Sequence, residues 1–258
     1  DNRGMEALAI ASEDPHRVRA SSKVGVDTCL RPLMRLLHVA DLHLNQRWFD
    51  WVTQQSSKYD AVIVAGDLQN AWVKEGMHAQ AKTIAKFLTS LSAPCLVATG
   101  NHDYWTARGS TDVYAEGGWL RILRGKGSVR AADGDVSDIA GLRVCCNGWL
   151  QVPDLFAQAD IIVTHAPPTG APCATGSEGM DAGDPEIWSA VSDCPPTLML
   201  CGHVHQPRSF ACQWPPVNPT TWILVSGYDE ASPVPQHWII DTDSKQAVHS
   251  TGIGIAWG

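Results

Sequence analysis

Short apolar runs recur along the chain, and most of them end in a residue that favours a turn. The runs are four to eight residues long and are rich in Val, Ile and Leu. Runs of this length and composition are typical of strands that are buried on both faces of a sheet. We therefore predict eight strands, at residues 33–40, 61–65, 95–99, 142–146, 161–164, 198–201, 222–226 and 237–241.

Between the second and third of these strands the apolar residues lie three or four positions apart. This spacing places them on one face of a helix. The residues of this face are Met77, Ala81, Ile84, Ala85, Leu88 and Leu91. Strand–helix units in the first half and a more purely β second half predict an α/β fold.

Two further short helices are predicted from their end signals. Asp184 is a candidate cap, followed by a proline in the first turn, of a helix that runs to about Val191. Asp112 is a candidate cap of another helix, which Gly117 and Gly118 would end.

The composition changes along the chain. Residues 1–33 lack periodicity and carry five Lys or Arg and five Asp or Glu, so we interpret them as an N-terminal extension or a leftover of an expression sequence. Residues 34–258 are predicted to form a single domain. Residues 166–183 and 206–220 are predicted to be long loops because they are rich in Pro and poor in periodic apolar positions. Loops of this length often have a function.

Overall composition argues against nucleic-acid and membrane partners and favours a cytoplasmic location. The 258 residues are 44% hydrophobic, which suffices for one sizeable core, and the net charge of −8 without a basic run argues against nucleic acid as a partner. No apolar run approaches the roughly 18 residues that suggest a membrane span, so no membrane partner is expected. The eight cysteines form no CxxC pair, which favours buried free thiols and a cytoplasmic location over a structural zinc site.

Polar residues cluster at the carboxyl ends of five predicted strands, where ligands bind in open α/β sheets. Carboxylate and imidazole donors together suit Zn, Mn, Fe or Ni better than Mg or Ca. Two such ions about 3.5–4 Å apart acidify a shared water and hold a phosphoryl group. The clusters are Asp41-Leu42-His43, Gly66-Asp67, Gly100-Asn101-His102-Asp103, His165 and Gly202-His203-Val204-His205.

These five motifs, in this order over roughly residues 34–241, resemble those of the calcineurin-like metallophosphoesterases. The resemblance implies a four-layer α/β/β/α fold, in which a two-sheet β-sandwich is flanked by helices. It also implies metal-dependent hydrolysis of phosphate esters. The implied cofactors are two divalent metal ions (Mn, Fe, Zn, Co or Ni) and a bridging hydroxide, which would be the nucleophile.

The resemblance further implies a role for each motif residue. Asp41, His43 and His205 would bind the first ion, Asn101, His165 and His203 the second, and Asp67 both. His102 matches a histidine that contacts phosphate and protonates the leaving oxygen. Asp103 would orient His102 from behind. The histidines outside the motifs are interpreted as structural or exposed: His16, His38, His78, His237 and His249.

Five residues near the motifs are candidates for substrate contact: Asn45, Trp72, Tyr104, Trp105 and Arg208. Aromatic side chains would form walls that hold a base or an aryl group, and Arg208 would meet a phosphate oxygen. Packing under the loops, or exposure to solvent, is the alternative for each of them, and the sequence leaves both open.

The expected partner is a small phosphoester or a nucleotide, and the expected activity is that of a phosphodiesterase or a broad-specificity phosphoesterase. A phosphomonoesterase or protein phosphatase remains an alternative. Residues 36–44 also resemble the nuclease branch of the family, but the chain length and acidic balance argue against a nuclease. The lipid-precursor pyrophosphatase branch usually has Arg where His102 stands. A scaffold without metals would need a broken site, whereas all seven ligand positions hold suitable residues. A homo-oligomer is left open.

Overall fold

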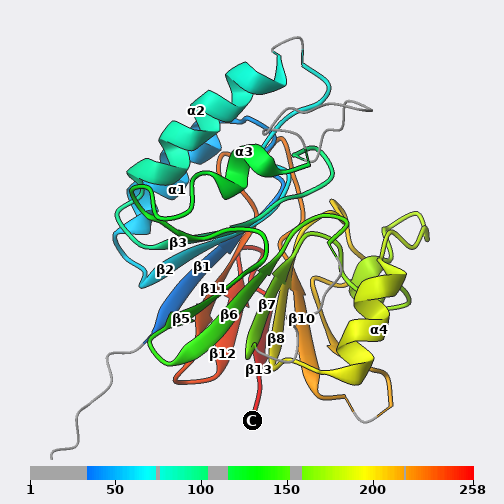
Figure 1. Ribbon diagram of the computed structural model, residues 1–258. Helices are drawn as coiled ribbons and strands as arrows, with labels where there is room; N and C mark the ends of the chain where they lie inside the picture. The colour runs from blue at the N-terminus through cyan, green and yellow to red at the C-terminus, as the bar shows by residue number, and fades with distance from the viewer. Residues whose placement is uncertain (1–33, 74–75, 104–115, 152–158, 218) are drawn as a thin grey trace, which may run out of the picture. The chain divides into compact units, whose positions relative to one another are not determined.

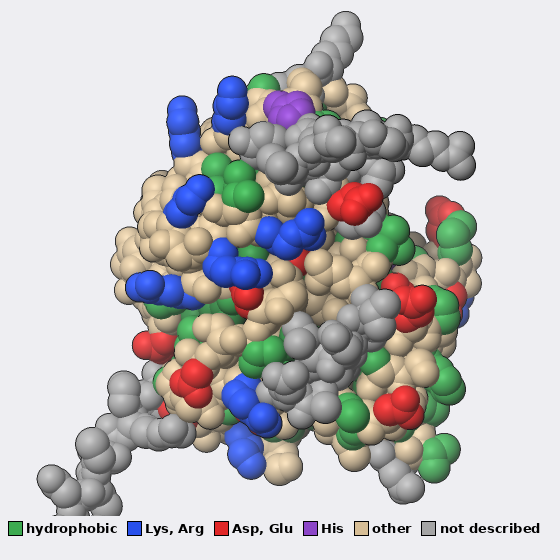
Figure 2. Space-filling model, viewed as in Figure 1, with side chains coloured by type: hydrophobic (Ala, Val, Ile, Leu, Met, Phe, Trp, Pro, Cys, Tyr) green, Lys and Arg blue, Asp and Glu red, His purple; other side chains and the backbone are tan. Residues whose placement is uncertain are grey.

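The computed structural model describes residues 34–73, 76–103, 116–151, 159–217 and 219–258. The predicted extension at 1–33 therefore lies outside the described residues. Within the described ranges, no helix combines the length and the apolar character that a membrane span requires. On the face drawn in Figure 2, the described Lys and Arg side chains are interrupted by acidic and neutral ones and form no continuous stripe.

Two mixed β-sheets form the middle of the fold (Figure 1). The first sheet has the seven-strand order β13-β12-β11-β1-β2-β3-β4, and the second has the six-strand order β5-β6-β7-β8-β10-β9. The first comprises β1 (Arg35–Val39), β2 (Ala61–Ala65), β3 (Cys95–Ala98), β4 (Val129–Ala131), β11 (His237–Asp241), β12 (Gln246–His249) and β13 (Gly254–Ala256). The second comprises β5 (Asp135–Ile139), β6 (Leu142–Asn147), β7 (Ile161–Thr164), β8 (Leu198–Cys201), β9 (Ala211–Trp214) and β10 (Thr221–Val225).

Helices cover the outer face of each sheet (Figure 1). The helices α1 (Gln46–Ser56), α2 (Met77–Ser90) and α3 (Gly118–Arg121) share a buried apolar core with the first sheet. The helix α4 (Pro185–Asp193) and the 3₁₀ helix η2 (Pro172–Ala174) share another with the second sheet. A third core lies between the sheets. The four-layer α/β/β/α arrangement is therefore confirmed.

The strand β2 shows why the central runs are apolar throughout. Ala61, Ile63 and Ala65 belong to the core between the sheets, whereas Val62 and Val64 belong to the core under the helices. Successive side chains of a strand point to opposite faces. Because both faces are covered here, both sets of side chains leave water on folding.

The motif-bearing strands run parallel within each sheet: β1 with β2, β2 with β3, and β7 with β8. Their carboxyl ends therefore lie along one edge of each sheet. The strand β10 is also parallel to β8, and β6 to β7. The loops after these strands reach the same edge.

All eight predicted strands are present; four have the predicted ends, and the ends of the other four shift by one or two residues. The helix predicted from 77 is α2. The Asp184 cap is confirmed, since its side chain accepts hydrogen bonds from Glu186 N and Ile187 N at the start of α4. The helix then extends to Asp193, two residues beyond the predicted end.

One local prediction was wrong. Residues 206–220 are not one loop, because they contain the edge strand β9, which pairs with β10. The four prolines of this stretch lie outside the strand, where no ladder hydrogen bond is needed from their nitrogens. Gly117, with φ of 75°, is the cap at the start of α3; the helix that it was predicted to end falls on residues outside the described ranges. The predicted cap Asp112 lies outside the described residues.

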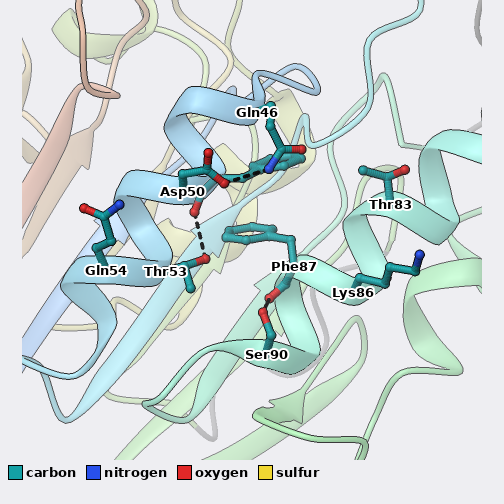
Figure 3. A pocket seen from close by; sticks show the side chains of 9 residues that line it. Gln46, Asp50, Thr53, Gln54, Thr83, Lys86, Phe87 and Ser90 are labelled. Atoms are coloured by element: carbon teal, nitrogen blue, oxygen red, sulfur yellow. Dashed lines mark hydrogen bonds between the residues drawn. The ribbon is translucent and has the colours of Figure 1, made fainter.

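The helix α1 was missed by the sequence analysis. Trp48, Phe49 and Val52 form its buried face, and Asn45 caps it, with the side chain accepting from Trp48 N at 3.4 Å. Between α1 and α2 lies a groove of about 500 Å³ on the outer helical face (Figure 3). Its floor is the stacked pair Phe49 and Phe87, whose ring centroids lie 4.3 Å apart. No motif residue lines this groove.

His38 links the two sheets. Its Nε2 lies 3.0 Å from the carbonyl oxygen of Cys201, so β1 of the first sheet is bonded to β8 of the second. The side chain is fully buried, and burial lowers the pKa of His38 to about 4. This confirms the structural reading of His38, which is neutral and donates from Nε2 at physiological pH.

We predict that His38 makes folding stability depend on pH. Its folded pKa lies below the unfolded value of 6.5, so its contribution is present above pH 6.5 and is lost as the pH falls towards 4. The loss amounts to about 2–3 kcal/mol between pH 7.5 and 4.5. Urea unfolding of the wild type and His38→Gln across this range should give a shallower slope for the variant. The difference at pH 7.5 supplies the baseline cost of the substitution, and parallel slopes would contradict the prediction.

Candidate metal centre

Hydrogen bonds join the loops of the two sheets at this edge. Within the first sheet, Asp41 N donates to Gly66 O at 3.0 Å and His43 N donates to Asp67 O at 2.9 Å. Across the sheets, His203 N donates to Asp41 Oδ2 at 3.1 Å. The loops after β1, β2 and β8 are therefore fixed relative to one another by the backbone and by one carboxylate.

The loop after β7 is joined to the same assembly. His165 Nδ1 lies 2.7 Å from Ala65 O of the first sheet, and His165 O accepts from Gly202 N at 2.9 Å. The other ring nitrogen, Nε2, lies 3.1 Å from Asn101 Oδ1. The five motif loops thus meet at one place, as expected from the strand order.

In the part of the chain that the structure describes, three groups of side chains have donor atoms within 4.8 Å of one another. The groups are Asp41, His43 and His205; Asp41, Asp67 and His165; and His43, Asp67 and His102. They overlap, since Asp41, His43 and Asp67 each belong to two groups. Overlapping groups of carboxylates and imidazoles are what two neighbouring ions need, with one carboxylate between them.

Individual distances fit this description. His205 Nε2 lies 3.5 Å from Asp41 Oδ1, and His165 Nε2 lies 3.3 Å from Asp67 Oδ1. His203 belongs to none of the three groups, but its ring centroid lies 5.0 Å from that of His165. All seven residues predicted as ligands are therefore brought together.

Several of these residues have a left-handed backbone. The φ angles are 53° at Asp41, 42° at His43, 54° at Asp67 and 68° at His203. Residues with a Cβ rarely adopt this region, and each instance stores on the order of 1–3 kcal/mol. Strain of this kind persists where the surroundings over-determine the backbone. Here the hydrogen bonds between the loops do so.

Two motif glycines are required by close approach. A Cβ at Gly66, where φ is 84°, would lie 2.6 Å from His165 Nδ1. A Cβ at Gly100 would lie 2.5 Å from Asp67 N. Gly66 therefore needs both the left-handed backbone and the space, whereas Gly100 needs only the space.

The electrostatics of the centre favour positive charge. Burial raises the pKa of Asp67, but the imidazoles of His165 and His43 outweigh it and hold the pKa below its usual range. Burial lowers the pKa of His165, yet Asp67 and Asp41 raise it to about 9. The carboxylates of Asp41 and Asp67 are almost completely buried. A buried carboxylate needs a compensating cation, so this donor set fits divalent metal ions.

Asp103 has a different place from the predicted one. Its carboxylate accepts hydrogen bonds from Leu68 N at 3.0 Å, Gln69 N at 2.9 Å and Gly100 N at 3.0 Å. It is fully buried beneath the loops that follow β2 and β3. Among the described residues, no hydrogen bond joins it to His102. Asp103 therefore fixes the two loops to each other.

His102 is oriented by the backbone instead. Its Nδ1 accepts from Ala71 N at 3.2 Å, and its Nε2 lies 3.9 Å from Asp67 Oδ2. The ring of Trp72 lies 4.3 Å from that of His102 and 5.4 Å from that of His43. Trp72 is 71% exposed, so this substrate candidate stands at the mouth of the centre.

The other substrate candidates are not brought to the centre by any described contact. The side chain of Asn45 caps α1. Arg208 is exposed, and its guanidinium lies beside Gly179 in the loop between β7 and α4. Tyr104 and Trp105 lie outside the described residues.

Two aromatic residues at the centre were missed. The ring of Trp149 lies 5.3 Å from that of His203, and the ring of Tyr228 lies 4.5 Å from that of His205. Trp149 follows β6 and Tyr228 follows β10, which are parallel neighbours of the motif strands. The rule that ligands bind at strand carboxyl ends applies to these strands too, and could have found both residues.

A family model supports the reading of the motifs. The model of the calcineurin-like phosphoesterases matches residues 34–207. The chain belongs to this family. It is a metal-dependent phosphoesterase, and the family implies a dinuclear site of divalent ions, for which the three side-chain groups supply donors. Comparison with curated protein sequences gives no match.

Solved structures share the fold of this calcineurin-like phosphoesterase at low identity. The protein TT1561 from Thermus thermophilus is 12% identical with a TM-score of 0.58, over 84% of this chain and 98% of that one. Purple acid phosphatase PPD1 from yellow lupin (Lupinus luteus) seeds is 14% identical with a TM-score of 0.54, over 84% of this chain and 51% of that one. Identities this low show a shared fold, and the chemistry must be argued from the site.

We predict that Asp103→Asn destabilises the phosphoesterase by about 1–3 kcal/mol. The amide group would present its own N–H donors to a pocket that contains three backbone N–H groups, and a buried unpaired donor costs about this much. Urea unfolding measures the loss. Asp138→Asn is the matched control, because Asp138 is exposed and, within the described ranges, accepts only from Gly141 N. Equal losses in the two variants would refute the role of Asp103.

Proposed function

We propose that this phosphoesterase hydrolyses phosphodiesters, or a broader range of small phosphoesters including nucleotides, at a two-metal centre. The observation that carries the proposal is the overlap of three groups of Asp and His side chains, one of which includes His102. Asp41, His43 and His205 would hold the first ion, Asn101, His165 and His203 the second, and Asp67 would hold both.

The donor chemistry supports Mn, Fe, Zn, Co or Ni as the ions, since imidazole nitrogens outnumber carboxylates. When bound, two such ions would supply the Lewis acidity that activates a water near neutral pH, and they would balance phosphoryl charge. The contribution of the protein is to fix the donors. The backbone bonds between the loops and the buried carboxylate of Asp103 do this before any substrate arrives.

His102 is the proposed general acid. Because its Nδ1 accepts from Ala71 N, the neutral ring carries its proton on Nε2, which faces the Asp67 side of the centre. When the ring is doubly protonated, Nε2 can pass its proton to the oxygen of a leaving group that departs there and leave a neutral ring; in that form Nδ1 carries a proton and no longer accepts from Ala71 N. Asp103 positions the loop on which His102 stands.

Charge balance supports a diester over a monoester. A phosphodiester carries one negative charge near neutral pH, whereas a monoester carries up to two. Among the described residues, no Lys or Arg forms an ion pair with the Asp residues of the centre. The metal ions and His102 would then balance the phosphoryl charge, which suits the less charged substrate.

The proposed compartment is the cytoplasm. Apart from Cys145, the described cysteines are free, and all of these but Cys194 are buried. Thiols of this kind are usual in a reducing compartment.

We predict that the metal-reconstituted wild type has a higher kcat/KM for bis-p-nitrophenyl phosphate than for p-nitrophenyl phosphate. Asp67→Asn should hold fewer than one ion per chain and lose at least about a thousandfold of the activity, because a bridging carboxylate serves both ions. Metal analysis and initial rates measure these quantities. Asp50→Asn, at an exposed position of α1, is the control and should retain both. Faster monoester hydrolysis would overturn the diester preference, and full turnover by Asp67→Asn would overturn the ligand assignment.

His102→Ala should slow diesters with poor leaving groups most, because these need the proton. For phenyl esters the expected loss of kcat is about 10²–10⁴-fold, and for p-nitrophenyl esters it is clearly smaller. His78→Gln changes a histidine in the exposed first turn of α2 and should leave both rates unchanged. The same loss for both esters would exclude His102 as the acid.

A further inference from the structure

Trp149 lies against two of the proposed ligands of the second ion. Its ring centroid is 5.3 Å from that of His203, with the planes at 48°, and 5.8 Å from that of His165, with the planes at 71°. His165 is fully buried, whereas Trp149 keeps part of its surface exposed. The indole therefore borders the centre and still presents an apolar surface to an incoming molecule.

A buried carboxylate anchors the backbone of Trp149. Trp149 N donates to Thr99 Oγ1 at 3.0 Å, and Thr99 Oγ1 donates to Asp133 Oδ2 at 2.7 Å. Thr99 N also donates to Asp133 Oδ1 at 2.8 Å. Asp133 is only 2% exposed, so water competes little for these bonds. Because Thr99 directly precedes the motif at 100–103, the anchor ties Trp149 to the loop that carries His102.

The residue before Trp149 packs on the same anchor. A Cβ at Gly148 would lie 2.7 Å from Asp133 Oδ1, so only glycine lets the chain pass this close to the carboxylate. The position of Trp149 is therefore fixed by the packing of its backbone on Asp133 and by the contacts of its ring with the two histidines. A ring that is already fixed loses little conformational entropy when a ligand stacks on it.

The aromatic residues of the centre occupy different sides. Trp72 contacts His43 and His102, on the side where the leaving oxygen would receive its proton. Trp149 contacts His165 and His203 instead. With His102 as the acid, a group near Trp149 would be the substituent that stays on phosphorus during hydrolysis.

Tyr228 has a different environment from the two tryptophans. Its ring lies against His43 and His205, and it also packs on Trp48 of α1 at 5.4 Å. It supports the ligands from the helix side. Tyr228 therefore packs against α1, whereas Trp149 is anchored through Thr99 to Asp133.

We propose that Trp149 determines specificity by stacking on a flat aromatic group, an aryl ring or a nucleobase, in the part of a phosphodiester that remains on phosphorus. Stacking on an indole needs a planar π-surface and no particular hydrogen-bonding atoms. The inference rests on the proposed two-metal phosphodiesterase function and names the substrate class of that site.

Two diesters with the same leaving group test this role. Bis-p-nitrophenyl phosphate and methyl p-nitrophenyl phosphate both release p-nitrophenolate, and they differ only in the group that is retained. In the metal-reconstituted full chain, Trp149→Ala should lower the ratio of their kcat/KM values at least about fivefold, mainly through the KM of the aryl ester. Trp149→Phe should keep most of the ratio, because it keeps an aromatic face.

Trp72→Ala is the matched control and should leave the ratio within about twofold of the wild type. Metal content and thermal unfolding of each variant show whether the centre is intact. An unchanged ratio in Trp149→Ala, a loss shared equally by both esters, or a larger change in Trp72→Ala would overturn the role of Trp149. Hydrolysis of neither ester by the wild type would instead refute the proposed function, so the two failures are distinguishable.

Discussion

The hydrogen bond from His203 N to the carboxylate of Asp41 joins the two sheets at the candidate metal centre. Asp41 lies at the end of β1 in the first sheet, and His203 follows β8 in the second. Each sheet alone carries only part of the donor set. Because the same carboxylate belongs to two of the donor groups, it connects the packing of the sandwich to the binding of a cation. The position of one sheet on the other therefore decides whether the centre exists.

Beneath the donors lies a layer of buried polar groups that accept from the backbone. Asp103 accepts from the loops after β2 and β3, and Asp133 accepts from Thr99 at the end of β3. Burial raises the pKa of Asp103 to about 7 and that of Asp133 to about 6. Because the pKa of each group is higher in the folded than in the unfolded chain, both groups lower the free energy of unfolding as the pH rises towards and through these values. Burying these two carboxyl groups therefore lowers folding stability. In return, their hydrogen bonds hold the loops that carry strained residues such as Asp67 in one geometry, which a metal centre requires.

The metal donors and the aromatic rings around them have different roles. The motif histidines and aspartates offer donors, and the proposed acid His102 is oriented by a backbone N–H. The aromatic rings around them occupy different sides, with Trp72 by His102 and Trp149 by His203. The leaving group of a substrate would therefore face Trp72, and the group that is retained on phosphorus would face Trp149.

The sequence by itself determined the central strands, the two main capped or periodic helices and the family. Runs such as 61–65 are apolar throughout because both faces of the strand are buried. This pattern can be recognised in the sequence without knowing which elements pack against the strand. The strands that it did not reveal, such as β5 and β12, are short and partly exposed, so their composition carries little signal. The motif residues were recognisable because their types and order are specific.

Tertiary structure decided what the remaining polar residues do. The side chain of Asn45 caps a helix, and the carboxylate of Asp103 links two loops. The ring of Trp149 lies beside His203 at the centre. The contacts of Asp103 with Leu68 and of Trp149 with Thr99 join residues that lie far apart in the chain. A sequence pattern reports local periodicity and residue type, whereas these roles depend on which strand ends are brought together when two sheets pack.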